Sequence, residues 1–200
     1  HARAFHPTRI VHGLLVTGEE RFRPGSSFFH RNIELGFHSL HSLLRALAEA
    51  EFDALPELIT LANGSLRIDD EAAPWPEKAT AIGPILVGPN EIEGLNAVYI
   101  DLEVEERRVL GVKRKIVKAG SLNNLLDELE AEPQSDILAY RGAHRLRRVR
   151  QALKVDDRAP SLLREGGAYL ITGGIGGASF IIARHLAEHF NAKLILCTRR

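Results

Sequence analysis

Apolar residues along the chain form two patterns, short runs and helical stripes, which alternate. Short apolar runs predict strands at residues 9–17, 58–62, 97–102, 137–140, 168–172 and 193–198. Apolar residues spaced three or four positions apart predict helices at residues 35–52, 77–87, 122–130 and 178–190. Because strands and helices alternate, we expect an α/β fold with parallel strand pairing.

Residues with special backbone preferences mark the ends of some of these elements. We expect Gly88 and Pro89 to end the second helix, and Asn191, which tolerates the left-handed conformation, to end the last one. The charged segment 144–150 (HRLRRVR) alternates enough to form an edge strand, whose arginines discourage mispairing.

The alternating pattern divides the chain into two α/β halves. We expect a first domain at residues 1–153, a linker at residues 154–165 (KVDDRAPSLLRE) and a second domain at residues 166–200. The segment after the first strand, residues 18–27, has no glycine cluster and no helix start placed to hold a phosphate. The second half stops after its second strand, whereas a doubly wound sheet needs further strands, so we expect a fragment of a longer polypeptide.

A glycine-rich turn joins the first strand of the second half to its helix. Strand, turn and helix in this order form an anion site, because the N–H groups and the dipole at the helix N-terminus favour a phosphate. The dinucleotide fingerprint G-x-G-x-x-G reads Gly174 to Ser179, with Ser179 in place of the third glycine. That position lies where helix and strand pack closely, so we expect weaker packing but a retained site. The candidate cofactor-binding residues of this turn are Thr172, Gly173, Gly174, Ile175, Gly176, Gly177 and Ser179.

Two arginines follow the second strand of this half, where the residue that selects the cofactor is expected. A carboxylate there would accept hydrogen bonds from the ribose of NAD, whereas the guanidinium groups of Arg199 and Arg200 pair with a 2′-phosphate. The sequence therefore predicts NADPH rather than NADH as the cofactor. The alternative is that both arginines are merely solvated.

Composition narrows the classes of partner. The chain of 200 residues carries 26 basic and 26 acidic residues, and its formal net charge of zero argues against nucleic acid and anionic membranes. The single cysteine, Cys197, lies in a predicted strand without a disulfide partner, which favours a reducing cytoplasm. No apolar run approaches the ~18 residues that a membrane span needs.

Residues for a chemical step are not found in the sequence. A reductase tyrosine is often followed by a lysine in the spacing Y-x-x-x-K, and none of the three tyrosines meets this condition. His185 and His189 have a metal-ligand spacing on one helix, but the HExxH signature is not matched and no third ligand is in sight. We therefore assign no catalytic residue and no metal ligand to the chain.

The order of these elements resembles the ketoreductase region of modular type I polyketide synthases over nearly the whole chain. The segment 164–200 is similar to that family's strand, TGGxGGxG turn, helix and arginine-ended strand. Upstream blocks resemble successive elements of the family's structural subdomain: PTRIVHGLLVTG, LGFHSLHSLLRAL, ELITLANG, PEKATAIGPILVGPNE and DILAYRGAHRLRRV. The order of the blocks is more specific than any one of them.

This resemblance implies a Rossmann-like fold. A truncated, cofactor-free structural half would brace the first β-α-β unit of a short-chain-dehydrogenase-like, NADP-binding half. It also implies that NADPH reduces the β-keto group of an intermediate tethered to an acyl carrier protein, with neighbouring synthase domains as further partners. By resemblance, Gly174 and Gly176 shape the turn at the pyrophosphate and Arg199, with Arg200, faces the 2′-phosphate, while the catalytic set of Lys, Ser, Tyr and Asn lies beyond residue 200.

Two other hypotheses stay open. The chain is alternatively a non-catalytic, reductase-like brace in a multidomain synthase, which Ser179 supports, or the reductase region of a related fatty acid synthase. The presence or absence of the catalytic set beyond residue 200 would decide the first alternative. The identity of the neighbouring domains would decide the second.

Overall fold

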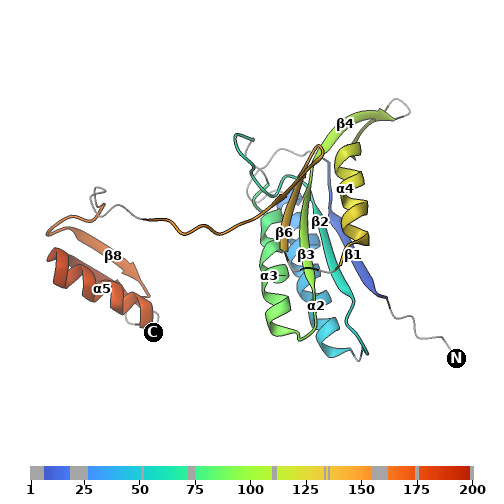
Figure 1. Cartoon of the computed structure of the whole chain (residues 1–200). Coiled ribbons are helices and arrows are strands. Elements are labelled where there is room, and N and C mark those ends of the chain that lie inside the picture. Colours follow the sequence, from blue (N-terminus) through green and yellow to red (C-terminus); the bar gives the residue numbers. More distant parts are fainter. Residues whose placement is uncertain are drawn as a thin grey trace. The chain divides into compact units, whose positions relative to one another are not determined.

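The computed structural model describes residues 7–18, 27–50, 52–71, 75–109, 112–132, 134, 136–154, 162–173 and 176–198. Contacts divide the chain into two compact units, His1–Arg150 and Gln151–Arg200 (Figure 1). Both units combine helices with parallel strands, which confirms the predicted α/β class. The predicted linker at residues 154–165 lies mostly outside the described residues and stays a prediction. None of the helices in the described part of the chain has the length and apolar character needed to cross a membrane.

The first unit is built on a five-stranded sheet in the order β1-β2-β3-β6-β7. The first four strands pair in parallel, as predicted, and β7 pairs with β6 antiparallel at the edge. These strands are β1 (Arg9–Leu15), β2 (Glu57–Ala62), β3 (Ala97–Leu102), β6 (Asp136–Arg141) and β7 (His144–Arg147), and a separate hairpin consists of β4 (Val104–Val109) and β5 (Val112–Val117). The helices are α1 (Ser27–Ile33), the π-helical η1 (Glu34–His38), α2 (Ser39–Glu49), the 3-10 helix η2 (Lys78–Ala81), α3 (Ile82–Glu91) and α4 (Ala119–Glu130).

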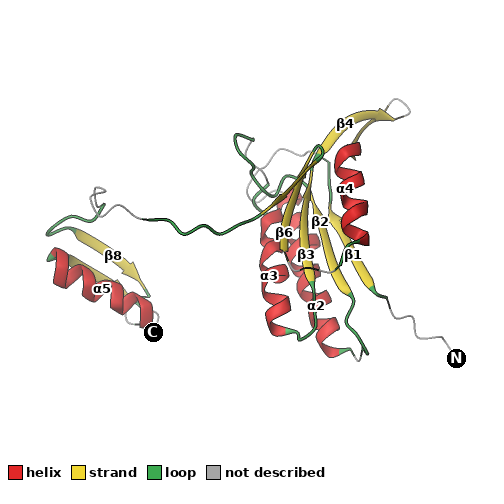
Figure 2. Ribbon diagram, in the orientation of Figure 1, coloured by secondary structure: helices red, strands yellow, loops and turns green. Residues whose placement is uncertain are grey.

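Helices cover both faces of this sheet (Figure 2). On one face, α2 and α3 pack in a cluster that contains Leu44, Ile85 and Tyr99. On the other face, Leu125 of α4 packs in a second cluster with Ile100. Successive side chains of a strand point to opposite faces, so every residue of β3 is buried between the two layers.

Two elements of the first unit go beyond the pattern of apolar positions. The helix predicted at residues 35–52 begins at Ser27, because α1, η1 and α2 follow one another without a break. The hairpin of β4 and β5 is not predicted by the sequence pattern. Its two strands are held by pairing with each other, in a segment rich in charged residues, and neither strand belongs to the main sheet. A periodic apolar face, which is what the pattern detects, is therefore not what forms this hairpin.

The predicted end of the second helix is wrong. α3 continues through Gly88 and Pro89 as far as Glu91. A proline lacks its own N–H group and restricts the residues before it, but the carbonyl of Gly88 still accepts a hydrogen bond from Ile92 at 2.8 Å. The helix therefore ends just after the proline rather than before it.

The second unit consists of two parallel strands, β8 (Ala168–Thr172) and β9 (Lys193–Cys197), joined by the helix α5 (Gly177–Phe190). Asn191 has the left-handed conformation, with φ 46° and ψ 36°, and ends α5 as predicted. This strand–helix–strand order and its boundaries agree closely with the sequence pattern.

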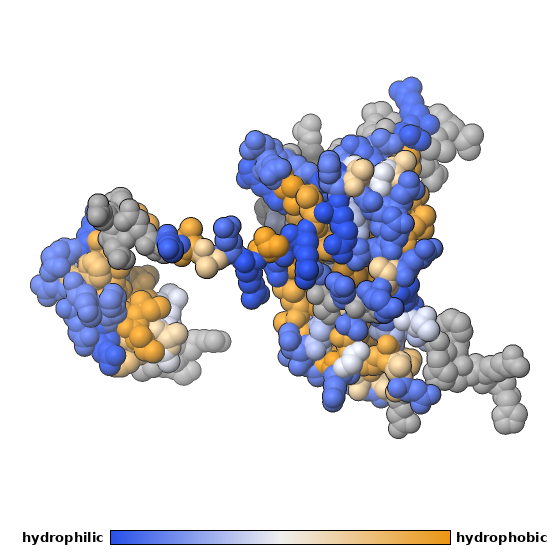
Figure 3. Space-filling model, in the orientation of Figure 1, coloured by the Kyte–Doolittle hydropathy of each residue, from blue (hydrophilic) through white to orange (hydrophobic). Residues whose placement is uncertain are grey.

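Burial in the second unit differs from the prediction. Short apolar runs such as 168–172 and 193–198 are typical of buried strands, but Leu170 and Ile195 are 64% and 63% exposed. Ile182, in the apolar stripe of the helix, is also exposed. Within α5 the buried residues are Ala183 and Leu186. One helix covers only one face of a two-stranded sheet, so apolar side chains lie on the surface of this unit (Figure 3).

We predict that Gly64→Ala lowers the free energy of unfolding of the first unit by about 2 kcal/mol or more. Gly64 follows β2 with φ +63°, and a Cβ there would lie 2.6 Å from ring atoms of Trp75, so backbone strain and a clash act together. Trp75 is the single tryptophan of the chain, and its fluorescence during urea unfolding measures the change. Gly94→Ala is the control, because Gly94 has φ +82° but a Cβ there meets nothing within 4 Å. Backbone strain alone should lower the free energy of unfolding by about 1 kcal/mol in Gly94→Ala. Equal losses of this free energy in the two variants would contradict the proposed clash with Trp75.

Candidate functional site

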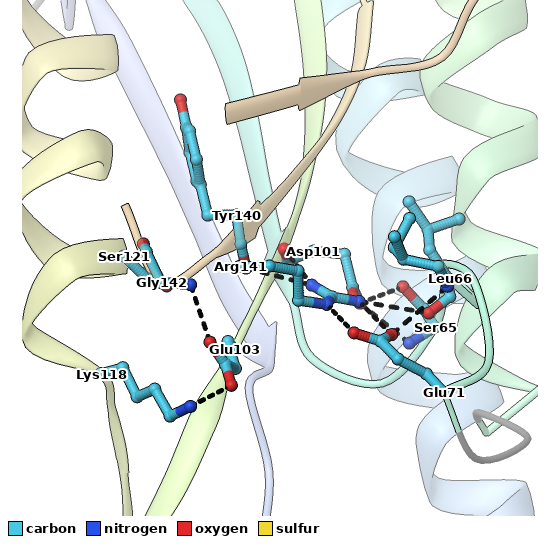
Figure 4. Close-up of polar contacts among 11 residues, drawn as sticks. Ser65, Leu66, Glu71, Asp101, Glu103, Lys118, Ser121, Tyr140, Arg141 and Gly142 are labelled. Carbon is cyan, nitrogen blue, oxygen red and sulfur yellow. Dashed lines mark hydrogen bonds and ion pairs between the residues drawn. The ribbon is translucent and has the colours of Figure 1, made fainter. Parts of the chain in front are cut away.

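The carboxyl ends of β2, β3 and β6 form one edge of the first sheet. In open parallel sheets, ligands bind outside the carboxyl ends of the strands, at the point where the strand order reverses. The chain leaves β2 towards α3 on one face, and it leaves β3 towards α4 on the other face. The strand order β1-β2-β3-β6 does not reverse, and side chains of the protein meet at this edge (Figure 4).

The guanidinium group of Arg141, the last residue of β6, lies among polar groups at this edge (Figure 4). It donates to Asp101 Oδ2 of β3 at 2.8 Å and to both carboxylate oxygens of Glu71 at 2.5 and 3.0 Å. It also donates to the main-chain oxygens of Leu66, Asp101 and Tyr140, at 3.3, 3.2 and 3.1 Å. Three segments that are far apart in the sequence therefore meet at one side chain.

The charges in this network are compensated inside the protein. Asp101 is completely buried, and its Oδ1 accepts hydrogen bonds from the N–H and the hydroxyl of Ser65 at 2.8 and 2.6 Å. Burial opposes the charge of Arg141, but hydrogen bonds to Glu71 and Asp101 raise the pKa of Arg141 above its usual value. The same hydrogen bonds from Arg141 lower the pKa of Glu71. Arg141 and Glu71 therefore favour their charged forms in each other's presence.

A second polar cluster fastens the turn between β6 and β7. Glu103 accepts a hydrogen bond from the N–H of Gly142 at 2.8 Å and pairs with Lys118. Burial opposes the ionisation of Glu103, but the hydrogen bonds from Lys118 and Gly142 together lower its pKa. A Cβ on Gly120 of α4 would lie 3.0 Å from the main chain of Gly142, so helix and turn approach each other closely.

Side chains also occupy the carboxyl end of β1. Lys78 is completely buried, donates to the main-chain oxygen and to Oδ1 of Asn63 at 3.0 and 2.8 Å, and lies 4.4 Å from the centre of the Trp75 ring. Asn63 in turn bonds to the N–H and the carbonyl of Thr17, just beyond β1. This edge of the first sheet is therefore occupied by the protein's own polar side chains.

The glycine turn of the second unit lies between β8 and α5. Gly173 has φ +76°, which favours glycine, and its N–H donates to the carbonyl of Cys197 at 2.7 Å. Gly176 precedes the helix with extended backbone angles, and its carbonyl accepts from the N–H of Phe180 at 3.1 Å. Gly176 has no side chain to cap the helix, and the N–H groups of a helix's first turn favour an anion.

Little of the protein lies close to the described glycines of this turn. A Cβ on Gly177 would meet nothing within 4 Å, and one on Gly176 would meet only the carbonyl of Gly173 at 3.7 Å. The side chain of Ser179 is half-buried, and its Oγ lies 3.7 Å from the position of a Cβ on Gly173. The serine that replaces the third fingerprint glycine therefore lies near Gly173 of the turn, while Gly173, Gly176 and Gly177 carry no side chain.

The structure brings together within one turn five of the predicted cofactor-binding residues, namely Thr172, Gly173, Gly176, Gly177 and Ser179. The other four lie outside the described residues, and their roles stay predictions: Gly174, Ile175, Arg199 and Arg200.

The Arg141 network is the part of the site region that sequence reasoning missed. A signal existed, because Asp101 is an acid within an otherwise apolar predicted strand, and a carboxylate that is buried needs a cation. Arginines of the predicted edge strand also have acidic partners: Arg145 pairs with Glu128 and Arg147 with Asp136.

Two of the three tyrosines lie in the core of the first unit. Burial raises the pKa of Tyr99 and of Tyr140 above the usual value, whereas a reductase tyrosine acts as an acid with a lowered pKa. His185 and His189 stack on each other with ring centres 4.3 Å apart. Among the described residues no group of three metal-ligating side chains occurs.

Curated proteins that resemble the chain are named as polyketide synthases. No protein-family model matches it. It is 23% identical over 159 residues to a phenolphthiocerol/phthiocerol polyketide synthase of Mycobacterium tuberculosis, covering 79% of this chain and 8% of that protein. It is 38% identical over 72 residues to polyketide synthase PksM of Bacillus subtilis, covering 36% of this chain and 2% of that protein.

A solved structure shares the fold. It is an adenylation, ketoreductase and pseudo-Asub multidomain structure of a keto acid-selecting NRPS module, with a TM-score of 0.65 and 20% identity over 96% of this chain and 16% of that chain. The fold is thus the α/β fold found in a ketoreductase-containing synthase module. The homologues of the chain are polyketide synthases, which confirms the family resemblance read from the sequence, and the chain spans a small part of their length.

We predict that the first unit loses stability as the pH falls from about 5 to about 3. Hydrogen bonds from Arg145 lower the pKa of Glu128, and the pKa values of Glu71 and Glu103 are also lowered. A carboxylate with a lowered pKa stabilises the fold above its usual pKa of 4.5, and this stabilisation disappears as the pH falls through the folded pKa. Melting curves followed by Trp75 fluorescence at several pH values give the melting temperature as a function of pH. The melting temperature should fall less steeply with falling pH in Glu128→Gln, because glutamine cannot titrate. Equal slopes for this variant and the unaltered chain would contradict the role of Glu128.

Proposed function

We propose that the chain is part of a polyketide synthase ketoreductase region that reduces the β-keto group of an intermediate bound to an acyl carrier protein. The observation that carries the proposal is the glycine turn of the second unit, where Gly173, Gly176 and Gly177 have no side chain, in a chain whose relatives are polyketide synthases. The cofactor is NADPH, which when bound supplies the hydride.

Each part of the glycine turn has a role in this proposal. The N–H groups of the first turn of α5 bind the pyrophosphate, and Gly173 and Gly176 let the backbone approach it. Arg199 and Arg200 bind the 2′-phosphate, which selects NADPH over NADH. The first unit acts as a brace, and the residues that protonate the alkoxide belong to the catalytic set expected beyond residue 200. Neighbouring synthase domains and the acyl carrier protein are the partners.

A second candidate is a reductase-like brace without activity. Ser179 favours it, because its half-buried side chain stands where the fingerprint has glycine. The two candidates differ in whether the longer polypeptide consumes NADPH. The polyketide synthase names of the relatives favour this family over a fatty acid synthase as the parent.

The test measures cofactor consumption with a β-ketoacyl thioester by a synthase polypeptide that extends through the whole catalytic half. We predict turnover with NADPH, and a tenfold to hundredfold weaker NADPH binding in Arg199→Asp. A charged hydrogen bond of about 1.5–3 kcal/mol is lost in that variant. NADH should be much less affected, because it has no 2′-phosphate for Arg199 to bind.

Arg148→Asp provides the matched control, since it makes the same charge change at an exposed arginine of the first unit. The 200-residue chain alone should not consume NADPH with the β-ketoacyl thioester, because the catalytic set is expected beyond residue 200. No turnover by the longer polypeptide would favour the inactive brace. Equal losses of NADPH and NADH binding in Arg199→Asp would show that this arginine has only a structural role.

A further inference from the structure

The guanidinium group of Arg141 lies in a shell made of acceptors. Its six hydrogen bonds go to three carboxylate oxygens, of Asp101 and Glu71, and to three main-chain carbonyl oxygens. Such a shell matches a planar cation with several N–H groups in a fixed fork. A spherical ammonium ion, with three donors on one atom, would leave some of these acceptors without a partner.

We propose that the shell of acceptors at the carboxyl ends of β2 and β3 is a guanidinium receptor that the chain fills with its own Arg141. The acceptors come from the loop after β2, from β3 and from the end of β6, and the arginine side chain occupies the space between them. This inference concerns the first unit and stands independently of the proposed ketoreductase function.

Most of the receptor is built without Arg141. Asp101 lies in the fully buried strand β3, and Ser65 holds its Oδ1 with two hydrogen bonds. The carbonyl of Leu66 comes from the loop after β2, next to Ser65. Removing the arginine side chain would therefore leave a buried, oriented carboxylate whose Oδ2 lacks a cation. A buried carboxylate without a cation is strongly unfavourable, so the receptor should take up a cation of the right shape from solution.

The receptor also explains how the first unit is held together at this edge. One guanidinium group joins the loop after β2, the middle strand β3 and the end of β6. The side chains of Arg141 and Asp101 are 16% and 0% exposed, so water competes little for these hydrogen bonds. Arg141 is thus the positioning residue of this edge.

The experiment is chemical rescue of Arg141→Ala in the 200-residue chain, with Trp75 fluorescence as the reporter of the first unit. We expect the variant to melt about 10 °C or more below the unaltered chain, because one partner of a buried ion pair is removed. Guanidinium chloride at roughly 50 mM should raise its melting temperature by about 2–4 °C, as expected for a ligand present at several times its dissociation constant. The unaltered chain should be unchanged or slightly destabilised by the same addition.

Two controls separate a shaped receptor from a general salt effect. Ethylammonium chloride at equal concentration should rescue Arg141→Ala less than guanidinium does. Arg45→Ala removes an exposed arginine that pairs with Glu49, so it should neither lower the melting temperature nor respond to guanidinium. If Arg141→Ala does not fold alone, recovery of the native Trp75 signal on addition of guanidinium is the rescue.

Arg141→Lys keeps the positive charge and provides an independent test of the proposed receptor. It should fold but melt below the unaltered chain, because one ammonium group cannot reach all the acceptors. The proposal is overturned if guanidinium does not rescue Arg141→Ala, if ethylammonium rescues it equally well, or if Arg141→Lys is as stable as the unaltered chain.

Discussion

The carboxylate of Asp101 lies in the middle strand of the first sheet without any exposure to water. An ionised group in such a place costs several kcal/mol unless other groups compensate it. Arg141 and Ser65 supply this compensation from the end of β6 and from the loop after β2. The arrangement of three strand ends therefore depends on one buried ion pair. Glu71 also accepts a hydrogen bond from Arg141, which fixes the loop after β2 to this ion pair.

The two units use the same kind of edge in opposite ways. At the carboxyl ends of the first sheet, the side chains of Arg141, Asp101 and Lys78 fill the edge. At the carboxyl end of β8, the described glycines carry no side chain, and the N-terminus of the helix that follows lies at the turn. Charge decides what each edge can accept: the first is a shell of acceptors around a cation, and the second is a set of donors for an anion.

The sequence predicts those features that depend on local preference. The strand at residues 97–102 matches β3 because it is apolar nearly throughout, and Asn191 ends α5 because few residues tolerate its backbone conformation. The glycine turn is located for the same reason, since Gly173 needs a positive φ.

Features that depend on distant contacts are not found in this way. Asp101 and Arg141 are 40 positions apart, and only the pairing of β3 with β6 makes them neighbours. Burial of Leu170 is predicted from its apolar character, but burial requires a second covering layer, which one helix does not provide. The two arginines that would select NADPH stay a prediction from the sequence.

The central claim is that the glycine turn of the second unit accepts a phosphate, whereas the edge of the first sheet is filled by the protein itself. Its most direct test is a nitrogen-15 NMR titration of the 200-residue chain with adenosine 2′,5′-bisphosphate, the phosphate-bearing half of the cofactor. If the second unit binds phosphate through its glycine turn, the amide signals of Gly173, Gly176 and Gly177 should shift with increasing ligand. The amide signals of Ser65 and Gly142, at the filled edge of the first sheet, should stay in place. Shifts at Ser65 and Gly142 with none in the glycine turn would contradict the account.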